Sequence, residues 1–396
     1  MDIEKRINEI FSELAEIRRD FHANPELSEK EFRTSDKICE ILKNLNIEYT
    51  KNVAETGIVG IIRGKKGGKT VAARADIDAL PIVEKNDVPY KSKNCGVMHA
   101  CGHDIHTTVL IGVAKILKEL ESEFEGNVKL FFQPAEETVG GAKRMVQEGC
   151  LKNPDVDYVV GLHVQSYIDA GKIELKYGKL NAQTDELIIT IIGKSGHGAY
   201  PDTSIDAIVI AANVITALQT LVSRNISPLN SVVLSLGQIN GGTKNNIICD
   251  SVEIKGILRT LDSETRAYAI KRIQEITTNI CDAYGGNCLI EIKDGYRYLI
   301  NSDEVVDIIY NTAKEIIGEE NIQFKEMPSM GGEDFSYFMD DNVKGAFYHL
   351  GCGNKEIGIT SPLHSDSFDV DENCIKTGVL VQVKSILALL DANRGN

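Results

Sequence analysis

The chain has 396 residues and a formal net charge of −15, and 42% of its residues are hydrophobic and 26% charged. This composition is ordinary for a globular enzyme, and the length exceeds what one hydrophobic core usually supports, so we expect two domains. The acidic balance, without a basic patch, argues against nucleic acid as a partner.

The beginning of the chain predicts a charged amphipathic helix and lacks the apolar stretch of a signal peptide. No apolar run is expected to approach the roughly 20 residues of a membrane span. Nine cysteines, an odd number without regular spacing, are typical of a reducing compartment. We therefore expect a cytoplasmic protein without a membrane partner.

Apolar residues at helical spacing predict two helices within residues 1–46. Helices and strands then alternate, which predicts an α/β fold with a mixed, largely parallel sheet and helices on both faces. Asp78, Glu137 and His163 each follow a predicted strand, so they are expected at the carboxyl ends of the strands, where such sheets bind ligands. The predicted strands here are 57–62, 70–74, 128–132 and 156–163, with a helix over 105–120.

Near residue 181 the pattern changes to β-α-β-β-α-β, which predicts an α+β ferredoxin-like unit. Its strands are 187–192, 232–239, 252–261 and 288–292, and its helices are 205–222 and 264–284. We predict a catalytic domain of residues 1–180 and 293–396 with an inserted lid of residues 181–292. Helix 205–222 is more apolar than a solvated helix needs, so it packs on its own sheet or contacts a second copy of the chain.

Cys101 and His103 lie two residues apart, just before the long helix of the first domain. Thiolate and imidazole are ligands of zinc and related first-row ions, and a helix N-terminus favours an anion such as a thiolate. The alternative is a buried cysteine beside a loop histidine.

Glu136 and Glu137 follow a strand that Pro134 ends. Adjacent side chains on extended backbone diverge, so one carboxylate can bind a metal ion while the other faces a water molecule. The alternative is a solvated acidic turn.

His163 and His364 are each weak evidence for a metal site when taken alone. His163 could be an ordinary core histidine, and His364 an ordinary turn histidine. Together with Cys101, His103 and the two glutamates, they supply enough ligands for two ions and leave one carboxylate over. A structural zinc site needs four ligands and no spare base, so this surplus indicates metal-assisted hydrolysis.

Three polar residues of the predicted lid are candidates for substrate contacts. His197 lies between glycines and could reach a substrate oxygen once the lid closes, or it lies in an ordinary turn. Asn246 and Arg259 could bind a substrate carboxylate, or they are solvated surface residues.

These motifs together resemble the dinuclear metal aminoacylase/carboxypeptidase family. Within it, the chain resembles the amidohydrolase branch of hippurate hydrolases, indole-3-acetyl-amino acid hydrolases and N-acetyldiaminopimelate deacetylases. The most specific matches are Cys-Gly-His-Asp at residues 101–104 and Gln-Pro-Ala-Glu-Glu at residues 133–137. Further matches lie at residues 18–27, 74–81, 193–201, 331–335 and 363–365. The resemblance implies a zinc-exopeptidase-like catalytic domain.

The resemblance also implies two divalent ions per subunit, as zinc, manganese, cobalt or nickel. The implied metal ligands are Cys101, His103, Glu137, His163 and His364. Cys101 is the residue we expect to bridge the ions. In the wider clan a His-x-Asp motif supplies a ligand, and here that position reads Asp76-x-Asp78, so both aspartates are expected to support the ligands rather than bind metal.

The roles implied for the remaining residues define an amidohydrolase. Glu136 would be the general base and acid, and His197 would donate to the oxyanion, reaching the site of a partner subunit in a homodimer formed through the lid. Asn246 and Arg259 would bind the free carboxylate of the amino acid. One departure from the family is Cys249, which stands where relatives usually carry proline.

The implied reaction is hydrolysis of the amide bond of an N-acyl amino acid or short peptide by a metal-activated water. Lowering the pKa of water from about 15.7 to about 7 corresponds to about 12 kcal/mol, whereas an oxyanion donor contributes about 3–4 kcal/mol, so the metal is expected to dominate. The alternatives are an aminopeptidase or dipeptidase on the same scaffold, or a metal-binding protein without turnover.

Overall fold

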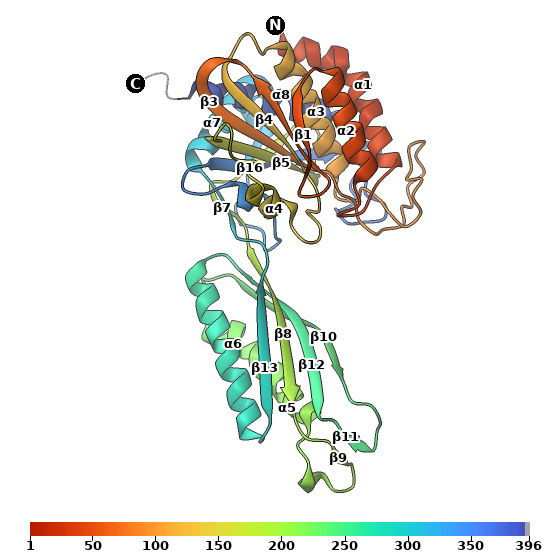
Figure 1. Cartoon of the computed structure of the whole chain (residues 1–396), viewed down its shortest axis with the longest axis vertical. Helices are drawn as coiled ribbons and strands as arrows, with labels where there is room; N and C mark the ends of the chain where they lie inside the picture. The colour runs from red at the N-terminus through yellow and green to blue at the C-terminus, as the bar shows by residue number, and fades with distance from the viewer. Residues whose placement is uncertain (393–396) are drawn as a thin grey trace. The chain divides into compact units, whose positions relative to one another are not determined.

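The computed structural model describes residues 1–392, and the chain divides into two compact units (Figure 1). The larger unit comprises Met1–Gly178, Ile300–Met327 and residues 334–392, and the smaller comprises Lys179–Leu299 and Pro328–Glu333. The segment Pro328–Glu333 lies outside the predicted lid of residues 181–292. It belongs to the smaller unit because its backbone pairs with residues near the start of that unit: the N–H of Ala182 donates to the carbonyl of Ser329 at 3.0 Å.

The larger unit is built on a mixed sheet with a parallel centre. In spatial order its strands are β1 (Glu48–Val53), β2 (Gly57–Arg63), β4 (Glu125–Gln133), β3 (Lys65–Asp76), β5 (Tyr158–Asp169), β16 (Lys344–Gly353), β6 (Ile173–Leu175) and β15 (Ile322–Phe324). The pairings β4–β3, β3–β5 and β5–β16 are parallel, whereas β1–β2 and β2–β4 are antiparallel. The predicted mixed, largely parallel sheet is confirmed.

Alternate residues of β4 face two different layers, as the period of a strand requires. Val128, Leu130 and Phe132 are buried in the main core, whereas the ring of Phe131 lies 5.2 Å from that of Phe338 on the other face. Helical segments therefore cover both faces of the sheet. The helices of this unit are α1 (Ile3–Ala23), α2 (Phe32–Asn44), α3 (His103–Glu119), α4 (Gly141–Gln147), α7 (Asp303–Ile317) and α8 (Cys374–Asp391), with short helices η3 (Glu319–Asn321), η4 (Asp334–Phe338) and η5 (Lys355–Ile357).

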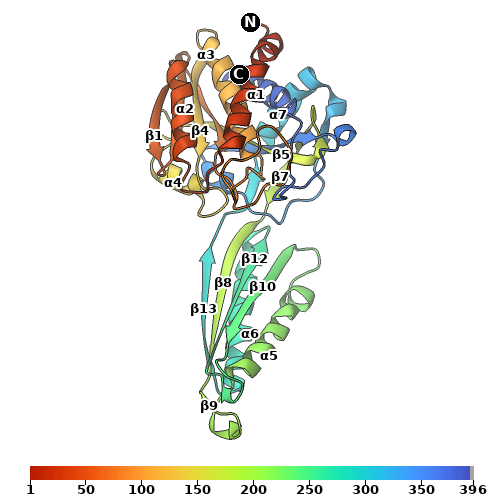
Figure 2. The ribbon, with the colours of Figure 1, turned by 90° about the vertical axis from the view of Figure 1, so that its right-hand side faces the viewer.

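The smaller unit has an antiparallel sheet with two helices on one face (Figure 2). In spatial order its strands are β10 (Val232–Gly241), β12 (Ser251–Thr260), β8 (Gln183–Ile192) and β13 (Asn287–Asp294). The helices are α5 (Ala207–Thr220), which continues as η2 (Leu221–Asn225), and α6 (Ser263–Ala283). Asp206 and Asp262 cap the two helices by accepting backbone N–H bonds. This order of elements matches the predicted ferredoxin-like arrangement.

Two short strand pairs and one short helix complete the description. Strands β9 (Gly196–His197) and β11 (Ile247–Ile248) pair with each other, and so do β7 (Gly178–Asn181) and β14 (Leu299–Asn301). A short 3-10 helix, η1 (Pro201–Thr203), follows β9.

One helix, Ala207–Asn225, is long and apolar enough to cross a membrane by length and composition, although core helices of soluble proteins pass the same test. The expectation that no apolar run approaches this length is therefore wrong. The apolar character has a local reason, because Ile210, Val214 and Leu218 are buried in the core of the smaller unit.

Glu174 is a buried carboxylate of the larger unit that several side chains hold in its ionised form. It accepts hydrogen bonds from the hydroxyl of Tyr167 at 2.7 Å, from Nδ1 of His349 at 2.8 Å and from Nε2 of Gln323 at 3.0 Å. Burial alone would raise the pKa of Glu174, but the hydrogen bonds of His349 and Tyr167 lower it from 4.5 to about 2.

We predict that Glu174→Gln makes the protein less sensitive to acid. Since the native pKa lies below the unfolded one, the ionised carboxylate stabilises the fold above about pH 4.5, and this stability is lost as the pH falls toward about 2. Between about pH 6 and about pH 3 the wild type should lose about 2 kcal/mol of its free energy of unfolding through this carboxylate. Urea unfolding of the metal-free protein at both pH values measures it. Equal acid sensitivity in wild type and variant would assign the effect to other carboxylates.

Candidate metal centre

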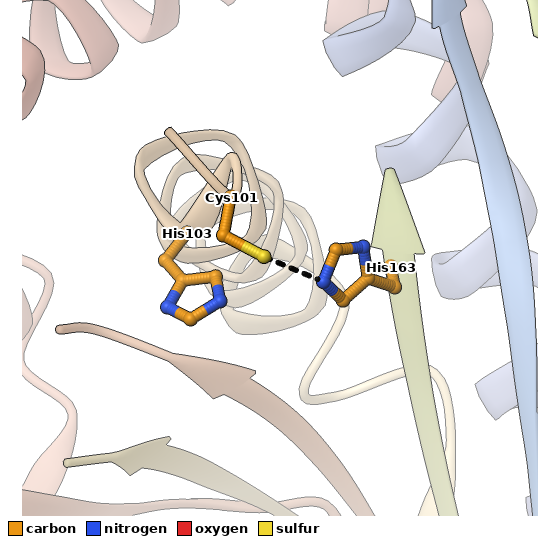
Figure 3. Close-up of side chains that lie close together, drawn as sticks. All are labelled: Cys101, His103 and His163. Atoms are coloured by element: carbon orange, nitrogen blue, oxygen red, sulfur yellow. Dashed lines mark hydrogen bonds between the residues drawn. The ribbon is translucent and has the colours of Figure 1, made fainter. Parts of the chain in front are cut away.

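Cys101 and His103 flank a glycine that starts helix α3. Gly102 has a left-handed φ of 81°, and a Cβ there would lie 2.3 Å from Cγ2 of Val164, so a side chain at this position would be strained and would collide with β5. The turn directs the Cys101 thiol toward His163 of β5, with the His103 ring alongside (Figure 3). The distance from Sγ of Cys101 to Nε2 of His163 is 3.3 Å.

The five predicted ligands come together in two groups of three that share Cys101. The ligand atoms of Cys101, His103 and His163 all lie within 4.8 Å of one another, and so do those of Cys101, Glu137 and His364. Nε2 of His364 lies 3.3 Å from Sγ of Cys101 and 3.3 Å from Oε1 of Glu137. The thiol is thus the one ligand atom common to both groups.

Hydrogen bonds turn the Nε2 atoms of two histidines toward this cluster. Nδ1 of His103 lies 2.9 Å from the backbone carbonyl of Asp78, and Nδ1 of His163 lies 2.8 Å from that of Val164, so both rings donate from Nδ1. A metal-ligating histidine is commonly fixed by such a bond from its other nitrogen.

Two buried atoms of the cluster lack a hydrogen-bond partner among residues 1–392: Nε2 of His103 and Oε1 of Glu137. Orphaned buried polar atoms are rare in native proteins. Burial alone would lower the pKa of His103, but the carboxylates of Asp76, Asp78 and Glu137 raise it to about 10. The site therefore favours a positive charge at this nitrogen, and the donor set fits a divalent cation that would displace the proton.

Cys101 needs such a cation to be a thiolate. Burial raises the pKa of its thiol well above the ordinary value, and the carboxylates of Glu137 and Glu136 raise it further. A bound metal ion reverses this preference because it stabilises the thiolate directly.

A strained turn presents the two adjacent glutamates. Ala135 has a left-handed φ of 54°, which is costly for a residue with a Cβ, and its N–H donates to Oε1 of the buried Glu31 at 2.9 Å. Carboxylate oxygens of Glu136 and Glu137 and a ring nitrogen of His103 lie within 4.8 Å of one another. His364 is also left-handed, with a φ of 62°. Strain of this kind gathers at functional sites.

Asp78 is hydrogen-bonded to two of the predicted ligands. Its Oδ1 lies 3.1 Å from Nδ1 of His103, and its Oδ2 accepts the N–H of Glu137 at 3.0 Å and the hydroxyl of Ser28 at 2.6 Å. The carboxylate therefore orients one ring and one peptide of the cluster.

The structure brings together only two of the three predicted substrate-binding residues of the smaller unit. His197 pairs with Ile247, and the N–H of Gly198 donates to the carbonyl of Asn246 at 2.9 Å, so His197 and Asn246 are neighbours.

Arg259 lies near the far end of β12, eight residues beyond Ser251, which corresponds to about 26 Å of strand. Asn246 precedes that strand, so Asn246 and Arg259 do not meet on one carboxylate within a single copy of the unit. Within residues 1–392 no hydrogen bond occupies the half-buried guanidinium of Arg259.

Two buried residues near the cluster were not predicted. Glu31 fixes the Ala135 turn, and its signal in the sequence was no more than a glutamate at the start of a helix. His106 lies three residues after His103 on the same helix, so the two rings share a face, and their centroids are 5.4 Å apart. That spacing was the available signal for His106.

Thiol, imidazole and carboxylate groups that could hold divalent ions, with a further carboxylate beside them, are the donor set of a metal-dependent hydrolase. The comparisons with known proteins agree with this class. The chain belongs to the peptidase family M20/M25/M40, whose pattern matches residues 72–388.

Among its relatives, the chain is 40% identical to thermostable carboxypeptidase 2 of Saccharolobus solfataricus over 98% of both chains. It is also 40% identical to the hippurate hydrolase of Campylobacter jejuni, over 86% of this chain and 88% of the relative.

A solved structure, the dinuclear metal-binding M20 peptidase YxeP of Bacillus subtilis, superposes with a TM-score of 0.85 at 30% identity and covers 97% of this chain and 99% of its own. The resemblance expected from the motifs is confirmed, and the protein is a metal-dependent amidohydrolase of this family.

Proposed function

We propose that the protein hydrolyses the amide bond of N-acyl amino acids and releases a carboxylic acid and a free amino acid. The observation that carries this proposal is the pair of three-residue groups that share the Cys101 thiol, with Glu136 beside them. Two ions held in this way leave one carboxylate for proton transfer. The hippurate hydrolase among the relatives supports an N-acyl amino acid as substrate.

In this proposal two divalent ions are held by Cys101, His103, Glu137, His163 and His364. Bound ions would polarise the amide carbonyl and lower the pKa of a coordinated water to about 7. Glu136 accepts the proton of the attacking water and passes it to the leaving amine. Asp78 keeps Nε2 of His103 turned toward the cluster.

The residues of the smaller unit bind the substrate in two places. Arg259, whose half-buried guanidinium makes no hydrogen bond within residues 1–392, binds the free carboxylate of the amino acid. His197 and Asn246 lie at the other end of β12, so we assign them to the site of a second subunit in a homodimer formed through this unit. A cytoplasmic location stays a prediction, supported by nine cysteines that are all free thiols.

The test of this function is a substrate panel. Metal-stripped protein reloaded with zinc, manganese, cobalt or nickel is assayed on N-acetyl, N-benzoyl and indole-acetyl amino acids and on dipeptides with a free N-terminus. We expect hydrolysis of the blocked amino acids. Preferential cleavage of the free dipeptides would favour the aminopeptidase or dipeptidase alternative, and binding of both ions without turnover would favour a non-catalytic protein.

We predict that His197→Ala keeps both metal ions and lowers kcat about 10²–10³-fold. The reason is that His197 would donate to the oxyanion without touching an ion, and the loss of one such donor has this magnitude. Initial rates on N-benzoylglycine, with metal content measured on the same samples, check it. The matched control is Lys194→Ala, an exposed residue of the same loop, which should keep the wild-type rate. An unchanged rate in His197→Ala would mean that His197 is a turn residue without a role in catalysis.

Mixing variants tests whether His197 acts across subunits. A heterodimer of His197→Ala with Cys101→Ser contains one subunit with an intact metal cluster and a partner with an intact His197. Random pairing after unfolding and refolding makes half of the dimers heterodimers. If His197 acts across the dimer, each heterodimer has one complete site out of two, so the mixture should recover about a quarter of the wild-type activity. No recovery would place His197 in the site of its own subunit.

A further inference from the structure

His106 is a buried histidine whose two ring nitrogens are both engaged. It is 1% exposed, and its Nε2 accepts a hydrogen bond from the backbone N–H of Val164 at 2.9 Å. Because a backbone N–H can only donate, Nε2 carries no proton. The proton of the neutral ring is therefore on Nδ1, which donates to Oδ1 of Asp76 at 2.5 Å. The Val164 N–H thus fixes the tautomer of His106.

The same Val164 residue orients the ring of His163. Its carbonyl accepts the hydrogen bond from Nδ1 of His163, and the rings of His106 and His163 lie in edge contact, with centroids 4.6 Å apart at 67°. A shift of the Val164 peptide would therefore turn the His163 ring and move its Nε2 away from the thiol of Cys101.

Strand pairing does not hold the Val164 N–H on this side of β5. The parallel ladder between β3 and β5 ends at the pair Arg74 and Gly161, three residues before Val164. His106 supplies the missing acceptor at the point where the chain leaves the ladder. An N–H left unpaired there would be destabilising, because it would lose the hydrogen bond it makes to water in the unfolded chain.

Asp76 holds the other side of the His106 ring. Its Oδ2 accepts from Nη1 of the fully buried Arg74 at 2.7 Å, and its backbone carbonyl accepts from the hydroxyl of Thr107 at 3.0 Å. Asp76, His103 and His106 have ligand atoms within 4.8 Å of one another, but both nitrogens of His106 are hydrogen-bonded, so this ring is not itself available to an ion.

We propose that His106 is a positioning residue of the metal centre. Its neutral ring, held by Asp76, fixes the Val164 peptide and thereby keeps Nε2 of His163 directed at the ion shared with Cys101 and His103. The inference rests on the proposed function, because it takes His163 to be a ligand. Removal of partners that orient a metal ligand typically lowers metal affinity 10–100-fold.

The experiment compares three variants of the full-length protein by competition for cobalt(II) with a chromophoric chelator. His106→Leu removes both hydrogen bonds, and His106→Gln keeps an acceptor at the position of Nε2. The matched control is His349→Leu, since His349 is a buried histidine that pairs directly with His163 in the sheet but bonds to Glu174 instead of Val164.

We expect His106→Leu to bind one of the two ions 10–100-fold more weakly and to change the visible spectrum of the cobalt protein. His106→Gln and His349→Leu should stay within about threefold of wild type. Wild-type affinity for both ions in His106→Leu, or an equal loss of metal affinity in His349→Leu, would overturn this inference but leave the proposed function standing. A wild type that binds no pair of ions would overturn the proposed function and this inference with it.

A second measurement keeps the inference testable if His106→Leu does not fold. Nitrogen-15 chemical shifts of the wild-type imidazoles report which nitrogen carries the proton. We expect His106 to be protonated at Nδ1 and bare at Nε2 both without metal and with zinc bound. The opposite tautomer, or a ring protonated at both nitrogens, would contradict the hydrogen bond from Val164 and overturn the inference.

Discussion

Glu136→Gln is expected to retain both metal ions and to lose about 10²–10⁴-fold in kcat. A glutamine has nearly the shape of glutamate but cannot accept the proton of the attacking water or deliver it to the leaving amine. Because Glu136 is not one of the five assigned ligands, the ion pair should survive the change. The measurement is kcat on N-benzoylglycine together with the metal content of the same preparation.

The neighbouring glutamate provides the control for this variant. Glu137→Gln changes an assigned ligand, and its Oε1 lies 3.3 Å from Nε2 of His364 and 3.8 Å from Nε2 of His103. It should therefore lose metal along with activity, whereas Glu136→Gln loses activity alone. Turnover near that of wild type in Glu136→Gln would remove this residue as the base, and loss of metal from it would make it a ligand.

His163→Ala is expected to lose metal and activity together. The substitution removes one of three ligands from the group formed with Cys101 and His103, so the affinity for that ion should fall by more than the roughly 10–100-fold seen when a supporting partner is lost. Metal content after dialysis against a chelator, followed by activity after stepwise addition of zinc, checks this. Recovery of activity should require far more zinc than in wild type.

The outcome that contradicts this prediction is a full metal content in His163→Ala after the same dialysis. His349→Leu serves again as the control, because it removes a buried imidazole next to His163 in the same layer of the sheet. A comparable loss of metal in that variant would mean that the layer as a whole, rather than one ligand, controls binding.

Periodicity predicted most of the helices and the central strands because their apolar residues face one core or two layers. It missed the edge strand β1, in which Glu48, Thr50, Lys51 and Asn52 are exposed, so no alternation of apolar and polar residues marks it. Strands β6 and β15 have three residues each and are too short to show a period. The segment Pro328–Glu333 was missed because it joins the smaller unit through backbone pairing across a long stretch of chain.

The contact between Asp78 and Glu137 could be expected from the sequence, because each follows a strand and the carboxyl ends of parallel strands meet at one edge of a sheet. The role of His106 was not predicted, because its partner is the backbone N–H of Val164. A hydrogen bond between a ring and a distant peptide has no signal in the sequence. The separation of Asn246 from Arg259 was not predicted either, because it depends on which end of a strand each residue occupies.

Gly102 has a consequence for efforts to redesign this enzyme. A methyl group at position 102 would strike Val164, whose peptide orients His163, so a single substitution in the Cys-Gly-His turn would disturb ligands from two distant segments at once. The inner ligands therefore have little freedom to vary one at a time. The side chain of His364 is 53% exposed, so this position should tolerate another ligand residue best. A substitution there can alter the ion preference while disturbing the other proposed ligands least.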